Sequence, residues 1–263
     1  MVDVQKLNDE RNIPIQKVGV KNLHYPITVL DKQYGEQHTV AKVNLFANLP
    51  HHYKGTHMSR FIEVFNQYYT DIQMPTFLTM LEEIRVALEA ETAYGEIRFP
   101  YFLQKAAPVS GQRGMMSYSC WFKGERGVHR KRFVVGVEVP VTTLCPCSKE
   151  ISARGAHNQR SYVRVQLQLG PFFWIEDVIE IVEAAASSGL YTLLKREDER
   201  FVTERAYDNP VFVEDLVRDV CIGIEGLDSF PWFSVEAENM ESIHNHDAYA
   251  FVERGEKQWQ SKE

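Results

Sequence analysis

An order of six predicted elements that occurs twice constrains this chain more than any other sequence feature. The first half predicts two strands, two helices and two strands, at 17–30, 37–49, 57–70, 75–91, 95–106 and 114–124. The second half repeats this order, at 129–142, 161–169, 174–187, 210–224, 231–239 and 247–254. Strands joined without an intervening helix pair antiparallel. Each half therefore predicts a four-stranded antiparallel sheet with a helix pair on one face, an α+β plan.

The spacing of apolar residues supports these elements. In 161–169 every second residue is apolar, from Val163 to Leu169, which is typical of a strand buried on one face. In 75–91 apolar residues recur at helical spacing after Pro75, a residue that suits a first helical turn. The repeat predicts two units of similar plan in one chain.

The boundaries of these units follow from the repeat. The joint is expected near Gly124–Gly127, in KGERGV. The predicted units are 17–125 and 126–255, with an N-terminal tail at 1–16 and a C-terminal tail at 256–263. The second unit is expected to carry most of the functional residues.

The connections in the second half are less regular than those in the first. The predicted helix at 174–187 could extend to residue 195. We expect the polar stretch KREDERFVTERAYDNP to be a connecting segment before the next helix. The helix at 210–224 is expected to be capped by Asn209, with Pro210 in its first turn.

Charge and hydropathy exclude several classes of protein. The net charge of −7 disfavours non-specific binding to nucleic acid, which needs a basic face. No apolar run approaches the roughly 20 residues that span a bilayer. The N-terminal sequence MVDVQKLNDERNIPIQ has no apolar core of a secretory signal. We therefore expect a cytoplasmic protein that binds neither nucleic acid nor membrane.

Reactive side chains are densest in the polar loop at 142–161. Long loops between strands are uncommon and usually functional. Cys145 and His157 are twelve residues apart in this loop and are residue types that zinc prefers. Cys145 and Cys147 are too close for an ordinary disulfide. The alternative is a free cysteine pair in a turn that is stiffened by Pro146.

Basic residues gather in and before the same loop. Lys149, Arg154 and Arg160 lie within it, and the run His129–Arg132 precedes it. Arginine and lysine pair with phosphate oxygens, so these residues are candidates for binding an anionic ligand in an acidic protein. The alternative is a solvated charged hairpin.

Two further polar groups open predicted helices. Glu214 lies in the first turns of the helix at 210–224, where a carboxylate can accept two N–H donors from a guanine-like edge. Its alternative role is a surface pair with Arg218. His57 and Arg60 open an earlier helix, at the end where anions are favoured.

Histidines and carboxylates elsewhere add candidates for proton transfer and metal binding. His244 and His246 would point to one face if their segment were a strand, and could act as general acid and base, as metal ligands, or as exposed polar residues. Glu199 or Glu204 could complete a Cys/His/Glu metal set, and local spacing does not select between them.

Five segments in this order resemble the prokaryotic type IB GTP cyclohydrolases: KGTHMSRF, LCPCSKEIS, GAHNQRS, NPVFVEDLVRD and ENMESIHNHDAYA. The resemblance extends from about residue 10 to residue 255. It implies the tunnelling fold, in which β-β-α-α-β-β units assemble into barrels. It also implies a homotetramer with two such units in each chain and active sites at subunit junctions.

The resemblance assigns roles to the candidate residues. By similarity, Cys145, His157 and Glu199 match the ligands of one divalent metal ion, with zinc as the expected ion and manganese or iron as alternatives. Glu214 matches the carboxylate that anchors the guanine or pterin edge. The residues that match the reaction centre are Cys145, Cys147, His244 and His246.

The implied reaction is the hydrolysis of GTP at guanine C8. Metal-activated water attacks C8, and His244 or His246 protonates N7 as the imidazole ring opens. Formate and 7,8-dihydroneopterin triphosphate, the entry to folate-type pterins, are the products. Two alternatives stay open: an NADPH-dependent nitrile reductase of the same fold, and a non-catalytic metal-binding module.

Overall fold

The computed structural model describes residues 5, 7–168, 170–256 and 260–261. The chain divides into two compact units. The first comprises Met1–Pro100, Trp121–Val135 and Gln258–Glu263, and the second comprises Tyr101–Cys120 and Gly136–Lys257. The two units alternate along the chain, whereas the expected division near residue 125 follows the repeat along the sequence.

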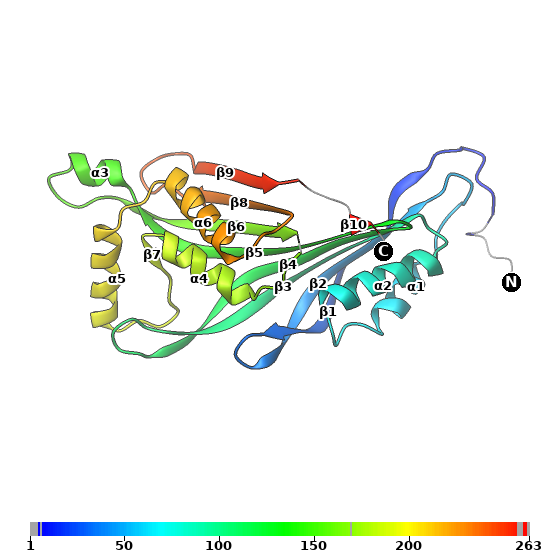
Figure 1. Cartoon of the computed structure of the whole chain (residues 1–263), viewed down its shortest axis with the longest axis horizontal. Helices are drawn as coiled ribbons and strands as arrows, with labels where there is room; N and C mark the ends of the chain where they lie inside the picture. The colour runs from blue at the N-terminus through cyan, green and yellow to red at the C-terminus, as the bar shows by residue number, and fades with distance from the viewer. Residues whose placement is uncertain (1–4, 6, 169, 257–259, 262–263) are drawn as a thin grey trace. The chain divides into compact units, whose positions relative to one another are not determined.

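The first half has the predicted order of elements, and the second half has this order with the further elements α3, β7, α5 and β10 (Figure 1). The first half contains β1 (Ile15–Asp31), β2 (Gly35–Leu49), α1 (Met58–Phe65), α2 (Met74–Ala87), β3 (Thr92–Ala106) and β4 (Arg113–Gly127). The second contains β5 (Arg130–Leu144), α3 (Pro146–Ile151), β6 (Asn158–Gln168), α4 (Ile175–Ala185), β7 (Ser188–Gly189), α5 (Arg196–Asp208), α6 (Val213–Leu227), β8 (Trp232–Asn239), β9 (Ala248–Gly255) and β10 (Gln260–Ser261). The strand order is β1-β2-β3-β4-β5-β6-β8-β9, and β7 and β10 each pair with β5. The antiparallel α+β prediction is confirmed.

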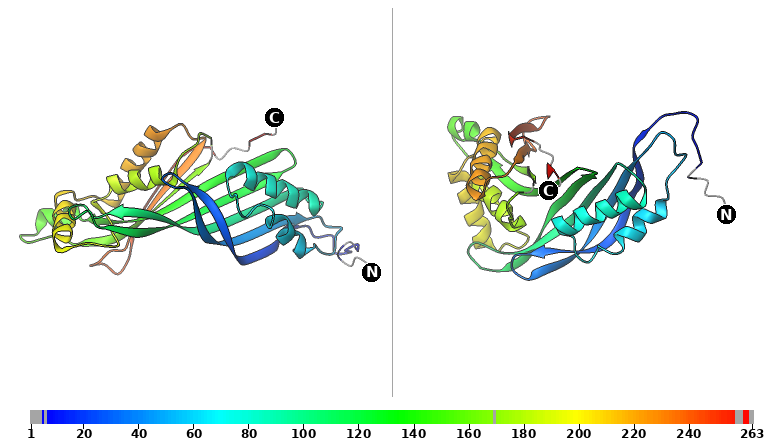
Figure 2. Two further views of the ribbon diagram at one scale, coloured as in Figure 1. Left: turned by 90° about the horizontal axis from the view of Figure 1, so that it is seen from below. Right: turned by 45° about the vertical axis from the view of Figure 1, so that its right-hand side comes forward.

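Packing in the first unit follows the period-two pattern of β2. Val43, Leu45 and Ala47 are buried on one face of the strand. The helices α1 and α2 lie side by side on one face of the strands of this unit (Figures 1 and 2). The ring of Phe77 in α2 packs on Gly124 of β4 so closely that an added Cβ would lie 2.4 Å from the ring. Glycine is therefore required there for the helix to approach the sheet.

The second unit is built in the same way. Val163 and Val165 of β6 are fully buried, and β6 pairs antiparallel with β8 in a register that matches Val165 with Val235. Leu169, the last residue of the predicted strand, lies outside the described residues. α4 packs against α6 with Ile181 over Gly223, where a Cβ would lie only 2.5 Å from the isoleucine side chain.

Two expectations for the second half are wrong. The segment that was expected to connect two helices is itself a helix, α5. It buries only Asp198 and Ala206, so it has no apolar stripe for sequence periodicity to detect. The next helix, α6, begins at Val213, not at Pro210. Asn209 is instead the C-cap of α5, and its Nδ2 donates a hydrogen bond to the carbonyl of Ala186.

The helices in the described ranges are short. α2 has 14 residues and α6 has 15. Over these ranges, no helix is both long and apolar enough to cross a membrane.

Candidate functional site

The loop after β5 brings Cys145 and His157 together in the second unit. Cys145 is the N-cap of α3, and its sulfur accepts a hydrogen bond from the amide of Ser148. The amide of Cys145 donates to the carbonyl of His157 at 3.1 Å. The hydroxyl of Ser148 donates to the carbonyl of Cys145 and accepts from the amide of His157 at 3.2 Å. Backbone and serine bonds thus close the loop.

The cysteines differ in their surroundings. All four are free, with Cys145 half-buried and Cys147 exposed beside it. Burial raises the pKa of the Cys120 thiol above its ordinary value, and burial followed by the nearby Glu225 carboxylate raises the pKa of Cys221. The neutral thiol, which is not the reactive or metal-binding form, is therefore favoured at Cys120 and Cys221.

A histidine cluster lies beside this loop. The rings of His157 and His244 are 6.3 Å apart between centroids, and His244 stacks on His246 at 5.1 Å. His244 and His246 lie in the connection between β8 and β9, not on a strand. Their side chains are close because the rings stack, and not because a strand places them on one face. The structure therefore brings three of the expected site histidines together.

A glutamate that the sequence analysis did not single out also lies at this site. Oε2 of Glu241 is 3.7 Å from Nδ1 of His157, and the side chain is 10% exposed. Over the described ranges, this oxygen accepts no hydrogen bond. The signal for Glu241 was its position three residues before His244 in ENMESIHNHDAYA.

Glu199 lies in the first turn of α5 and is exposed. The loop that holds Cys145 contacts the other end of this helix, where Lys149 donates a hydrogen bond to the carbonyl of Tyr207. Glu199 precedes Tyr207 by about 12 Å along the helix axis at 1.5 Å per residue. Glu204, the alternative ligand, forms an ion pair with Arg200. In the described part of the chain, no group of three or more metal-binding side chains is assembled.

Glu214 is exposed in the first turn of α6. The expected surface partner, Arg218, pairs instead with Asp215 at 2.9 Å. Asp215, and not Glu214, therefore forms the surface ion pair with Arg218.

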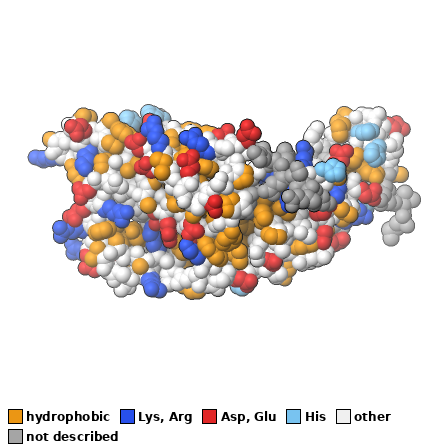
Figure 3. Space-filling view, viewed as in Figure 1, with side chains coloured by type: hydrophobic (Ala, Val, Ile, Leu, Met, Phe, Trp, Pro, Cys, Tyr) orange, Lys and Arg blue, Asp and Glu red, His pale blue; other side chains and the backbone are white. Residues whose placement is uncertain are grey.

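The basic candidates differ in their surroundings. Nζ of Lys149 donates a hydrogen bond to the carbonyl of Tyr207 and lies 4.4 Å from the centroid of the Tyr207 ring. Arg154 and Arg160 are exposed. On the face seen in Figure 3, acidic and basic side chains are interspersed and form no large basic patch.

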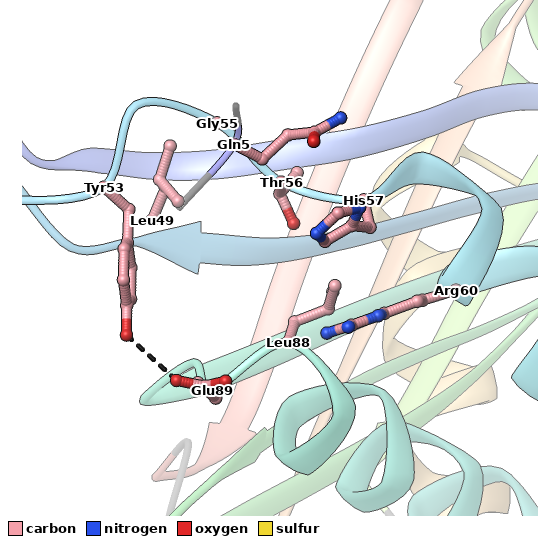
Figure 4. A pocket seen from close by; sticks show the side chains of 9 residues that line it. All are labelled: Gln5, Leu49, Tyr53, Gly55, Thr56, His57, Arg60, Leu88 and Glu89. Carbon is pink, nitrogen blue, oxygen red and sulfur yellow. Dashed lines mark hydrogen bonds between the residues drawn. The ribbon is translucent and has the colours of Figure 1, made fainter. Parts of the chain in front are cut away.

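His57 and Arg60 belong to the first unit. They line an open pocket together with Tyr53, Leu88 and Glu89 (Figure 4). The guanidinium of Arg60 donates to the carbonyl of Ala87, and the hydroxyl of Tyr53 donates to Glu89 at 2.9 Å. The pocket thus holds one arginine and one carboxylate.

The run His129–Arg132, also basic, lies at the start of β5 in the first unit. Arg132 forms an ion pair with Glu125 at 3.4 Å. Part of this run is therefore neutralised within the unit.

Comparison with known proteins identifies the family. A family model described as "Type I GTP cyclohydrolase folE2" matches residues 1–250. The chain is 57% identical to GTP cyclohydrolase FolE2 of Syntrophus aciditrophicus, over 97% of this chain and 100% of the relative. It is 54% identical to GTP cyclohydrolase FolE2 of Geotalea uraniireducens, over 98% of this chain and 95% of the relative.

The fold also has a counterpart among solved structures. Uricase from Arthrobacter globiformis superposes with a TM-score of 0.54 at 7% identity, covering 94% of this chain and 96% of that one. At this identity the likeness concerns the fold alone, whereas the sequence matches are extensive and nearly full-length. The chain belongs to the type I GTP cyclohydrolase FolE2 family.

Proposed function

We propose that this protein hydrolyses GTP at guanine C8, releasing formate and 7,8-dihydroneopterin 3'-triphosphate, as the first step toward folate-type pterins. The observation that carries the proposal is the meeting of Cys145, His157 and His244 beside one closed loop. The relatives at 54–57% identity, which bear the name GTP cyclohydrolase, support it. All four cysteines are free, which suits the cytoplasm as its location.

The donor set fits a divalent metal ion. Cys145 and His157 would be two ligands, and a carboxylate oxygen would complete a zinc, manganese or iron site with an open position. Glu199 is our choice for the third ligand, supplied by a neighbouring subunit, because within one chain the Cys145 loop meets the opposite end of α5. When bound, the ion supplies a Lewis acid that lowers the pKa of water toward neutrality.

Glu214 orients the purine. Its carboxylate accepts hydrogen bonds from N1–H and the 2-amino group of guanine, a pair of parallel donors that one carboxylate matches. The neighbouring carboxylate, Asp215, is paired with Arg218 instead. The position of Glu214 at a helix start keeps the carboxylate on a rigid element.

Proton transfer falls to the stacked histidines. His244, whose ring centroid is 6.3 Å from that of His157, protonates N7 as the imidazole ring opens, while His246 supports its ring by stacking. Cys147 follows Pro146 on α3, exposed next to Cys145, and contributes a polar side chain to the same centre.

The triphosphate needs cations. Arg154 and Arg160 are exposed near the Cys145 loop and are our primary candidates. Lys149 supports the loop through Tyr207, and His57 and Arg60 are the candidates of the first unit. Arginine matches phosphate oxygens with two parallel donors.

A homotetramer with barrel-like assembly of the sheets is the proposed working form. The edge strand β9 exposes Tyr249 and Phe251, and an edge strand presents unpaired backbone groups that another chain can cover. Active sites at subunit junctions would then combine Cys145 and His157 of one chain with Glu199 of another.

One assay tests this function. Purified protein is stripped of metal, supplied with zinc or manganese, and given GTP, with formate and a fluorescent oxidised pterin as readouts. We expect both products only with metal and no effect of NADPH. Absence of a pterin with every divalent ion would overturn the proposal. Consumption of NADPH without formate would indicate a nitrile reductase, and intact GTP with bound metal would indicate a binding module.

A further inference from the structure

The Nδ1 atom of His157 faces two oxygen acceptors. Oε1 of Gln159 lies 3.0 Å from Nδ1, within hydrogen-bond distance. Oε2 of Glu241 lies 3.7 Å from the same nitrogen, and within the described ranges this buried oxygen accepts no hydrogen bond. A hydrogen on Nδ1 satisfies the amide oxygen and faces the carboxylate favourably, whereas a lone pair there would be repelled by both.

The amide of Gln159 bridges His157 and a buried hydroxyl. Its Nε2 donates to Oγ1 of Thr143 at 2.9 Å, and this hydroxyl is bonded to the hydroxyl of Ser161 at 2.8 Å. Gln159 is 7% exposed, and Thr143 and Ser161 are fully buried. Because the NH2 end is turned toward Thr143, the oxygen end points to His157. A chain of buried polar groups on β5 and β6 therefore leads to the histidine ring.

We infer that Gln159 and Glu241 hold His157 in the tautomer that carries its hydrogen on Nδ1, so that Nε2 presents its lone pair to the metal. A neutral imidazole has one donor and one acceptor nitrogen, so fixing the first fixes the second. Gln159 is thus a positioning residue for the proposed reaction. The inferred tautomer stands by itself, and only the metal ion as the partner of Nε2 rests on the proposed function. Partners of this kind commonly change metal affinity 10- to 100-fold.

The tautomer is measurable without metal or substrate. In metal-free protein labelled with nitrogen-15 at histidine, at about pH 9 where histidine side chains are generally neutral, the two ring nitrogens give distinct resonances for the N–H and lone-pair forms. The His157 signals are assigned by their loss in His157→Gln. We expect the N–H form at Nδ1. A hydrogen on Nε2 in the wild type would overturn the inference.

Matched variants test the partners. Gln159→Met removes the acceptor at similar size and should shift His157 to a mixture of tautomers and weaken cobalt binding at least tenfold. Gln159→Glu keeps an acceptor oxygen and should restore both. Gln166→Met, on the same strand but outside this chain of groups, should change neither. Melting of the metal-free protein shows whether each variant is folded, and unchanged affinity and tautomer in folded Gln159→Met would refute the role of Gln159.

Glu241→Gln separates two roles for the carboxylate. If Glu241 acts through His157, the variant alters the tautomer populations along with cobalt affinity. If affinity falls while the tautomer stays fixed, Glu241 is a ligand, and its part of the inference is wrong. Formate release by the wild type is measured separately, so failure of the cyclohydrolase proposal is distinguishable from failure of this one.

Discussion

The amide of Cys145 donates a hydrogen bond to the carbonyl of His157, joining the two ends of the α3 loop at 3.1 Å. The two side chains therefore start from adjacent backbone positions although they are twelve residues apart in sequence. A bond between main-chain groups does not depend on either side chain. Substitution of Cys145 or His157 should therefore leave this main-chain bond in place, and Cys145→Ala additionally removes the sulfur that accepts from the amide of Ser148.

Metal binding should depend on Cys145 and His157. Cys145→Ala and His157→Ala each remove a proposed ligand, and we expect both to lose nearly all metal and turnover while keeping the melting temperature of the metal-free protein. Metal content is measured by mass spectrometry after dialysis. Cys147→Ala is the matched control and should retain more metal than Cys145→Ala. Full metal content in the Cys145 and His157 variants would show that the site is elsewhere.

Glu214 should affect substrate recognition without affecting metal. Glu214→Gln keeps the shape of the side chain but loses the charged acceptor, and charge-assisted hydrogen bonds contribute about 1.5–3 kcal/mol. We expect kcat/KM for GTP to fall at least tenfold. Asp215→Asn, one residue along α6, breaks only the surface pair with Arg218 and should leave kcat/KM within about twofold. Normal kinetics in Glu214→Gln would remove it from the site.

Sequence patterns predicted those parts of the fold that are fixed by burial. Alternation in β6 and helical spacing in α2 report which face is buried, so their boundaries were found within a few residues. α5 has no such signal, because its first turn is stabilised by polar bonds. Asp198 accepts from the amides of Val109, Ser110 and Lys195. Val109 and Ser110 are distant from Asp198 in sequence, so local spacing does not reveal their contacts with it.

The candidate site was predictable to a similar extent. Cys145 and His157 share one loop, so their spacing in sequence limits their distance in space. His244 reaches them from the connection after β8, and only the pairing of β6 with β8 brings it there. Glu241 and Gln159 contact His157 in space. Apart from the closeness of Glu241 to His244 in sequence, nothing in their sequence context distinguishes them from other polar residues.

Acid stability of the first unit should depend on Glu82. Hydrogen bonds from Arg85, and then from Arg126, lower the pKa of Glu82 from 4.5 to about 2. A carboxylate with a depressed folded-state pKa contributes stability above its unfolded pKa, and this contribution is lost as the pH falls toward the folded value. Glu82→Gln should therefore cost about 1 kcal/mol at neutral pH. The difference from wild type should shrink between about pH 4.5 and pH 2.

Thermal melting across this pH range measures the effect. Glu91→Gln is the control, since Glu91 is an exposed glutamate nearby in sequence. A wild-type advantage over Glu82→Gln that persists unchanged at pH 2 would mean that the ionised carboxylate is not its source.

The assembly prediction is a tetramer. Light scattering should give a mass near four times 30.4 kDa at concentrations where the enzyme is active. Dilution should reduce metal content and formate release together, since the third ligand is proposed to come from a neighbour. A fully active monomer would contradict the shared site.

Complementation between inactive variants tests Glu199 directly. If Glu199 serves a neighbouring subunit, co-expressed Cys145→Ala and Glu199→Ala chains form some junctions in which Cys145 and Glu199 are both intact. Random mixing in a symmetric oligomer predicts recovery of about a quarter of wild-type activity. The matched control pairs Cys145→Ala with His157→Ala. Both residues belong to the same loop of one chain, so no junction regains a complete set and no activity should return. If the first pair also stays inactive while each chain still assembles, Glu199 acts within its own subunit or is not a ligand.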